Sequence, residues 1–362
     1  MAWIDGALTF GCNPDQLNER AFWKYNATMG TNYQYRRQIL ALDDDQLEEF
    51  VRQWALKKTE YVEVERFTGT GDMGRDVVGF LSSQRHEGPW HNYQCKQYGR
   101  TLPTETGVSE LGKVLYYAYK GEFTAPEKFF FVAPRGINRN LKSLIFKPST
   151  FKATMISEWE KYCAHAIVEN EHIPLDDALK AFIGAWDFSR IAPISVDIML
   201  TDAAATPVLY HWFGADPGPA PIGVAPSDVQ AIELPYIQGL LDAYSEREGA
   251  VFADHNAADA HAVHGPHLRM QRERYFDADA FTRFYRDNTT TKDTEDLRNE
   301  ILHGIYETHT ANHDDTLSRV NAVMIQAGNT QPAGPLAKYA RTPVKQGICH
   351  HFVNEGQLKW KL

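Results

Sequence analysis

Cysteine is scarce in this sequence: 362 residues contain only 4, namely Cys12, Cys95, Cys163 and Cys349. No two of them form a CxxC pair or another spacing typical of zinc ligands. So few cysteines in a chain of this length do not make a disulfide framework either. We therefore expect reduced cysteines that are buried in a hydrophobic core.

Long apolar runs are also missing. A membrane-spanning helix needs about 18 or more consecutive apolar residues, and the sequence has no such stretch. Residues 1–6 lack the basic segment followed by an apolar stretch that marks a signal peptide. The sequence therefore predicts a cytoplasmic protein with no membrane segment.

A surplus of positive charge is missing as well. The formal net charge of −10 argues against a surface that is basic throughout and binds nucleic acid nonspecifically, but it allows a local basic groove. One candidate groove is the segment 120–152, which is either a phosphate-contacting surface or a solvated loop. Its residues are Lys128, Arg135, Arg139, Lys142, Lys147 and Lys152, opposed by Glu122 and Glu127.

The chain shows no internal repeat and no low-complexity tract, which excludes solenoids and propellers. Hydrophobic residues make up 43%, with 8 Trp, 17 Tyr and 19 Phe, enough to bury the cores of two domains. The glycine- and proline-rich segment 213–221 interrupts the pattern of helices and strands. The predicted domains are therefore residues 1–215 and residues 216–362.

The first domain is predicted to be an α/β core, a mixed sheet flanked by helices. Apolar residues at helical spacing follow the acids at 43–45, and the segments after them alternate in the manner of strands. In chain order we expect a helix at 43–54, strands at 61–67, 75–81 and 90–98, a helix at 108–119 and an apolar, fully buried strand at 129–133. Residues 150–210 have helical patterns joined by short loops. Helix, three strands, helix and strand is the order of an α/β sandwich.

The second domain is predicted to be mainly α-helical, with helices at 234–248, 277–287, 294–309 and 315–327. His255, His261, His264 and His267 lie in an alanine-rich stretch, and their spacing fits a polar loop better than a metal site. The run from Cys349 to His351 is expected to be structural, because adjacent histidines point in different directions.

Three residues of the first half suggest hydrolysis of phosphodiester bonds. That chemistry needs a divalent metal to neutralise the phosphate and activate water, and a cation near the reacting oxygens. Asp76 follows the glycine-rich turn 69–74, and Gln94 and Lys96 lie two apart on the next strand, so they point to one face of the sheet. We expect these three side chains to converge.

Two further acidic positions are less well defined. Glu48 on the preceding helix reaches the same place if that helix packs across the sheet, although a register slip of one residue would exchange it for Glu49. Asp72 fits a turn-forming residue better than a ligand.

These residues resemble the motif of a known nuclease family. The acidic helix residue Glu48, the glycine-flanked run 71–77 with Asp76, and the Gln94-Cys95-Lys96 strand are similar to the Mrr-like branch of the PD-(D/E)xK nucleases. More narrowly, the N-terminal half resembles the nuclease domains of antiphage effectors of CBASS and of Lamassu, the SMC-ATPase-linked three-component systems, and most of all the LmuA-type subunit.

The resemblance implies a restriction-endonuclease-like core and a metal-dependent DNA endonuclease. It makes Asp76, Gln94 and Glu48 the ligands of Mg²⁺, for which Mn²⁺ can substitute, and it makes Lys96 the catalytic lysine. No organic cofactor is expected. The implied partners are DNA, an SMC-like ATPase subunit and a third small subunit, with self-association into a dimer or tetramer when active.

The sequence departs from the wider superfamily at Gln94, where many members have Glu or Asp. A neutral amide is a weaker metal ligand than a carboxylate, so the number of bound metals stays open. Two alternative functions also stay open: a stand-alone, modification-dependent restriction endonuclease, and a catalytically inactive nuclease fold that acts as a scaffold. The helix-forming stretch at 269–285, rich in Arg and aromatic residues, is either a protein interface or an ordinary helical core.

Overall fold

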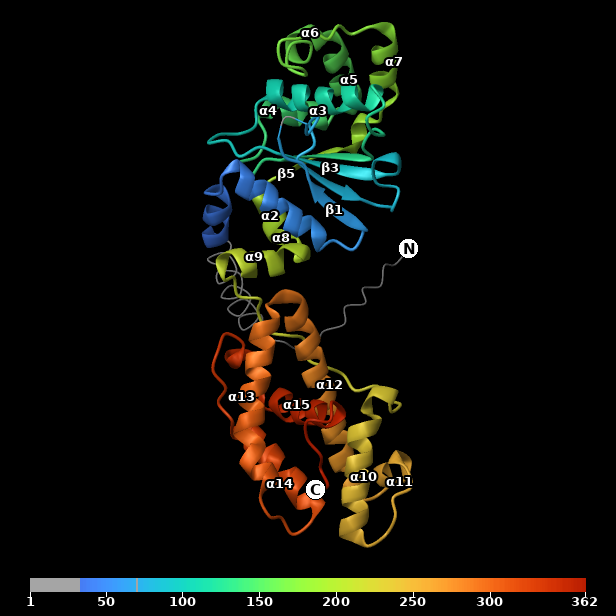
Figure 1. The fold of residues 1–362 in the computed structure, drawn as a ribbon, viewed down its shortest axis with the longest axis vertical. Coiled ribbons are helices and arrows are strands. Elements are labelled where there is room, and N and C mark those ends of the chain that lie inside the picture. Colours follow the sequence, from blue (N-terminus) through green and yellow to red (C-terminus); the bar gives the residue numbers. More distant parts are fainter. Residues whose placement is uncertain (1–32, 70) are drawn as a thin grey trace, which may run out of the picture. The chain divides into compact units, whose positions relative to one another are not determined.

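The computed structural model describes residues 33–69 and 71–362 (Figure 1). The chain divides into two compact units, Met1–Ala215 and Asp216–Leu362. The division falls inside the glycine- and proline-rich segment. Residues 1–6, on which the absence of a signal peptide was predicted, and Cys12 lie outside the described residues, as does position 70 of the glycine-rich turn.

The first unit is built on one mixed sheet of five strands. They are β1 (Glu63–Arg66), β2 (Val77–Phe80), β3 (Trp90–Cys95), β4 (Lys128–Val132) and β5 (Ile191–Ile194). The spatial order is the sequence order, with β1, β2 and β3 antiparallel and β3, β4 and β5 parallel. The predicted α/β class with a mixed sheet is confirmed.

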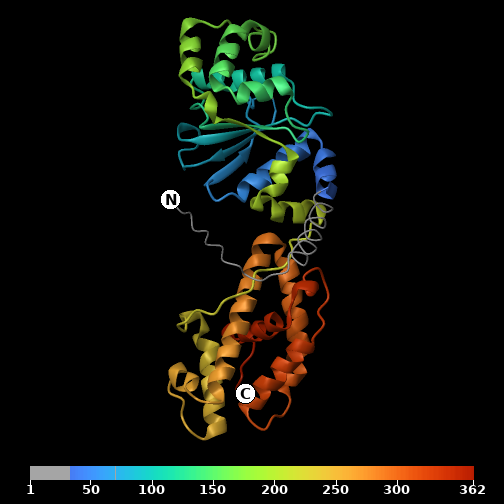
Figure 2. The ribbon, with the colours of Figure 1, turned by 180° about the vertical axis from the view of Figure 1, so that it is seen from behind.

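Helices cover both faces of this sheet (Figures 1 and 2). One face carries α2 (Asp44–Leu56), α8 (Val196–Thr201) and α9 (Thr206–Phe213); the other carries α3 (Thr104–Tyr119) and, beyond it, α4 (Arg139–Ile145), α5 (Pro148–Ser157), α6 (Trp159–Tyr162) and α7 (Asp177–Ala185). Residues 33–40 are also helical. Successive residues of a strand belong to the hydrophobic cores on opposite faces of the sheet: Val77 packs on the α2 side and Val78 on the α3 side.

Helix α2 begins where the acidic run predicts. Asp43 is the N-cap, its side chain accepts a hydrogen bond from the Gln46 backbone N–H, and the Gln46 side chain accepts from the Asp43 backbone N–H. Leu47, Phe50, Val51 and Trp54 are buried, as their spacing indicates. This helix therefore lies with a fixed face on the sheet, and that face determines which side chains of α2 reach the sheet's edge.

The expectation of only helices and loops at 150–210 was incomplete, because β5 lies in that segment. The strand is four residues long and contains Pro193, which lacks the N–H that an inner strand donates. Proline is tolerated because β5 is the last strand in the sheet and pairs only with β4. A short strand with a proline gives no alternating pattern to find.

Helices make up the second unit, all of which is described. They are α10 (Leu234–Glu248), α11 (His255–Asp259), α12 (His264–Asn288), α13 (Thr291–Thr310), α14 (Thr316–Asn329) and α15 (Thr342–Asn354). The histidine-rich stretch 254–267, expected to be a loop, instead contains α11 and the start of α12. Pro266 does not prevent this, because it lies in the first turn of α12, where a missing N–H costs little.

Helices α12 and α15 approach closely at Gly347. A Cβ built on Gly347 would lie 1.9 Å from the Arg274 carbonyl oxygen, and backbone cannot yield to it. We expect Gly347→Ala to destabilise the second unit by about 1–3 kcal/mol or more, measured by urea denaturation. Gly328→Ala in α14 is the matched control, because its Cβ meets the Thr342 Cγ2 atom at 3.2 Å and that side chain can move. Equal stability of the two variants would contradict this account of the α12–α15 contact.

The described cysteines agree with the prediction of reduced core residues. Cys95, Cys163 and Cys349 are free and buried. None of the described helices is both long enough and apolar enough to cross a bilayer.

Candidate active site

The residues singled out from the sequence meet at one end of β2 and β3. Asp76 directly precedes β2, Gln94 is on β3, and Lys96 directly follows β3. The antiparallel register pairs Val77 with Tyr93, which brings Asp76 opposite Gln94. The Lys96 backbone N–H donates to Val132 of β4, so the chain is still held in the sheet at the lysine.

Asp76 is the centre of this group and is only 4% exposed. Its Oδ2 atom accepts hydrogen bonds from Gln94 Nε2 at 2.8 Å and from the Cys95 backbone N–H at 2.7 Å. Lys96 Nζ lies 4.0 Å from the same oxygen. A side-chain amide, a backbone N–H and a lysine therefore surround a single oxygen of the Asp76 carboxylate.

Burial raises the pKa of Asp76 to about 7, against the lowering effect of Lys96, while the negative charges of Glu110 and Glu48 raise it further. For Lys96, burial lowers the pKa but Asp76 and Glu110 more than offset it, so its pKa is raised and it stays charged. The surplus of acidic groups makes a second cation favourable here, since a cation would stabilise the ionised form of Asp76.

Glu110 on α3 is a site residue that the sequence did not reveal. Its Oε1 atom lies 3.0 Å from Lys96 Nζ, and both side chains are about one-fifth exposed. The only signal was an acidic residue on the edge of an otherwise apolar helix face, next to Leu111 and three residues after Gly107. Spacing along the chain does not tie that helix to β3; the packing of α3 on the sheet does.

Glu48 and Glu49 are distinguished by their partners. Glu48 accepts from Arg66 Nε at 2.8 Å; burial raises its pKa while Arg66 lowers it, and Lys96 is near enough to contribute. Glu49 instead accepts from Arg52 and Gln53 of its own helix. Of the two acids, Glu48 is the one coupled to the Asp76 group, although Arg66 holds it.

Asp72 behaves as a turn-forming residue. Its Oδ1 atom accepts from the Gly74 backbone N–H at 2.8 Å and from Lys113 Nζ at 3.0 Å. Gly74 has a φ of 85°, and an added Cβ would also meet Val114 at 2.9 Å, so a glycine is required there. The turn thus sets the start of β2 and the position of Asp76.

The donors around Asp76 are of the type that suits Mg²⁺. The Asp76 and Glu48 carboxylates and the Gln94 amide are oxygen ligands, and Mg²⁺ prefers oxygen and retains several waters. Gln94 turns its nitrogen towards Asp76 and its oxygen accepts from Asn92 Nδ2 at 3.3 Å, so its amide would have to rotate to ligate. Asp76 does not belong to any group of three acidic, histidine or cysteine side chains of the described residues whose ligand atoms lie within 4.8 Å of one another. The donor set therefore fits an ion held mostly by water and few protein ligands.

The segment that follows Lys96 in the sequence contributes to a pocket. Its volume is about 600 Å³, and it is lined by Tyr98, Gly99, Arg100, Pro103 and Thr106. The segment 120–152 does not line this pocket. Most of its basic residues are exposed, including Arg135 and Lys142, whereas Lys152 donates to the Gly184 carbonyl. That exposure is compatible with both interpretations of the segment.

Two features of the second unit are parts of its core. His350 is fully buried on α15 and contacts Gln271 Oε1 at 3.0 Å, and Cys349 is buried beside it. The Arg- and aromatic-rich stretch of α12 buries Tyr275, Phe281 and Tyr285. For these residues the interpretation as a helical core holds over that of a protein interface.

The first unit is therefore an α/β fold with an acid–lysine cluster at the ends of the inner strands β2 and β3, and the second is a helical unit. Residues 233–360 match the family model described as C-terminal domain 6 of the ABC-three component (ABC-3C) systems. No curated protein and no solved structure matches the chain significantly. The match is confined to the second unit, and it is consistent with a component of an ABC-3C defence system.

Proposed function

We propose that this protein is the metal-dependent DNA endonuclease effector of an antiphage ABC-3C system. The observation that carries the proposal is the convergence of Asp76, Gln94 and Lys96 on one carboxylate oxygen at the ends of β2 and β3. The element order supports a PD-(D/E)xK core: a helix, three antiparallel strands, a helix and a parallel strand.

The proposed chemistry assigns a task to each side chain. Bound Mg²⁺ would neutralise charge on the phosphate and lower the pKa of the attacking water. Asp76, Glu48 and the Gln94 oxygen would hold the ion. The charged Lys96 is about one-fifth exposed, so its field acts on phosphate oxygens with less screening than on an open surface. Glu110 orients the Lys96 ammonium.

The surroundings suit a nucleic-acid strand. The pocket lined by Tyr98 and Arg100 begins two residues beyond Lys96, and it offers an aromatic ring and a guanidinium group to a sugar–phosphate chain. Exposed basic residues of the segment 120–152 add positive charge to the surface of the same unit in an otherwise acidic protein.

The C-terminal unit supports the regulatory part of the proposal. A domain characteristic of ABC-3C systems suits docking to an SMC-like ATPase subunit, with a third small subunit completing the complex. In this scheme the partners restrain the nuclease, and release or self-association into a dimer or tetramer activates it.

The deciding experiment is cleavage of plasmid and linear DNA by the purified chain, alone and with its partner subunits, in Mg²⁺ or Mn²⁺. We expect metal-dependent cutting that Asp76→Asn abolishes. Asp72→Asn is the matched control, in the turn four residues before Asp76. It should retain cutting, because Asp72 contacts Gly74 and Lys113 rather than the Asp76 group and the asparagine oxygen can still accept from Gly74.

Each alternative has its own outcome. Absence of cutting under every condition, with phage protection unchanged by Asp76→Asn, would leave an inactive scaffold. Cutting by the isolated chain only on modified DNA would indicate a stand-alone restriction endonuclease.

A further inference from the structure

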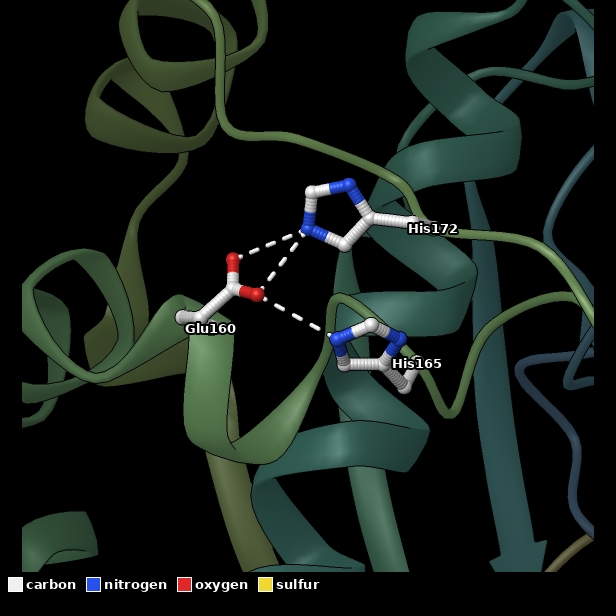
Figure 3. A group of neighbouring side chains, drawn as sticks. All are labelled: Glu160, His165 and His172. Carbon is white, nitrogen blue, oxygen red and sulfur yellow. Dashed lines mark hydrogen bonds and ion pairs between the residues drawn. The ribbon is translucent and has the colours of Figure 1, made fainter.

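A second cluster of potential metal ligands lies in the first unit, away from Asp76. It consists of Glu160 on α6 and of His165 and His172 in the loop that follows (Figure 3). His165 Nε2 lies 3.2 Å from Glu160 Oε1, and His172 Nε2 lies 3.0 Å from both carboxylate oxygens. Figure 3 shows a ring nitrogen of each histidine directed at the same carboxylate.

The spacing of these atoms fits a tetrahedral ion. With metal–ligand bonds of about 2.0–2.1 Å, two ligands of a tetrahedral zinc site lie about 3.3 Å apart. The two Glu160–histidine distances are close to that value, and the ligand atoms of all three residues lie within 4.8 Å of one another. Two histidines and a glutamate form a known protein ligand set for Zn²⁺, with the remaining position left to water.

The backbone holds the three ligands in place. Each is adjacent in sequence to a buried residue: Glu160 to Trp159, His165 to Ala164 and His172 to Ile173. The Ile173 backbone N–H donates to the Ala164 carbonyl at 2.8 Å, and Trp159 Nε1 donates to the Ile173 carbonyl at 2.9 Å. The anchors are therefore bonded to one another, and the loop brings its two histidines together whether or not an ion is present.

The electrostatic surroundings favour a cation. Glu169 and Glu171 are exposed in the same loop, and they add to the charge of Glu160. The nearest basic residue in sequence, Lys161, is directed to Glu158. Imidazole ligands select a transition metal over Mg²⁺, so this site differs in kind from the oxygen-only group around Asp76.

Another histidine cluster in the second unit is less suitable. Glu248, His261 and His264 also bring their ligand atoms within 4.8 Å. However, the His261 and His264 rings stack at 4.6 Å and 17°, and Tyr244 stacks on His264 at 4.4 Å and 18°. Stacked rings hold their nitrogen lone pairs nearly parallel, whereas a shared ion needs them to converge. The His165 and His172 rings are also close, at 4.8 Å, but they are tilted by 34°.

We propose that Glu160, His165 and His172 form a Zn²⁺ site in the first unit. The alternative is that Glu160 only accepts hydrogen bonds from the two imidazoles, and that arrangement binds no ion. The proposal does not depend on nuclease activity.

The test is titration of the purified full-length chain with Zn²⁺ in excess Mg²⁺ by calorimetry, together with Co²⁺ titration followed by visible absorption. We expect one Zn²⁺ ion bound at this cluster and intense Co²⁺ bands typical of tetrahedral coordination. His165→Ala/His172→Ala should weaken binding by more than the roughly 10- to 100-fold that loss of an outer-shell partner costs. The side chains of His165 and His172 are 67% and 48% exposed, so the double variant should fold.

Two matched variants locate the ion. His261→Ala should leave zinc binding unchanged, and Asp76→Asn should also leave it unchanged. Zinc should raise the melting temperature of the wild type but not of the double variant. The proposal is overturned if the wild type binds no Zn²⁺, if the double variant binds it equally well, or if His261→Ala removes it.

Discussion

Lys96→Ala is expected to reduce DNA cleavage by roughly 100- to 1,000-fold or more, the loss typical of removing one preorganised charge-stabilising group. Lys96 Nζ lies 3.0 Å from Glu110 and 4.0 Å from Asp76, so its loss leaves two acids without their cation. The Asp76 pKa, already about 7, should then rise further, so that more of Asp76 is protonated near neutral pH. The measurement is the rate of plasmid nicking and linearisation under single-turnover conditions.

Lys113→Ala is the control for this prediction. Lys113 also forms a 3.0 Å ion pair with a nearby aspartate, but its partner is Asp72 and not Asp76. Lys96→Arg should fold and remain largely inactive, because a planar guanidinium cannot replace a compact ammonium in a buried position. Full activity of Lys96→Ala would show that Lys96 takes no part in the reaction.

Arg272→Met is expected to destabilise the second unit by roughly 3–5 kcal/mol, because it leaves the buried Glu233 carboxylate without its ion-pair partner. Glu233 is fully buried, and Arg272 Nε lies 2.7 Å from its Oε1 atom. Arg272 also donates to the carbonyl oxygens of Pro226 and Asp228, so it ties the segment before α10 to α12. Urea denaturation should show a lower midpoint for the second unit.

A nearby surface pair provides the comparison. Arg269 and Asp259 form an ion pair in which both side chains are about half exposed. Arg269→Met should cost no more than about 1 kcal/mol, because solvent screens an exposed pair. The double variant Arg272→Met/Glu233→Gln should recover part of the lost stability. Equal effects of Arg269→Met and Arg272→Met would contradict the importance of burial.

The elements around the site could be predicted because local rules determine them. Gln94 and Lys96 share a face because strand residues alternate, and the glycine-rich turn places Asp76 at the start of the partner strand. The helix at α2 follows from its N-terminal acids and apolar spacing. In each case the signal is local, contained within one helix or within one strand and the turn before it.

Glu110 and β5 depend on packing between distant segments, so the sequence did not reveal them. Nothing local distinguishes Glu110 from other helix-surface acids; its role follows from where α3 crosses the sheet. Strand β5 is recognisable only from its pairing with β4. The Glu160–His165–His172 cluster has a similar origin, since the Trp159 and Ile173 anchors bring the two histidines together.

The two outer strands of the sheet restrict how copies of this chain can assemble. Strand β5 presents Pro193 at one edge, and β1 carries Glu63 and Glu65 at the other; each strand is only four residues long. Short, charged or proline-bearing edges resist the addition of another strand. If activation requires self-association, copies should join through helices rather than by extending the sheet into a continuous ribbon. Their number would then be limited by the closed symmetry of a helical contact.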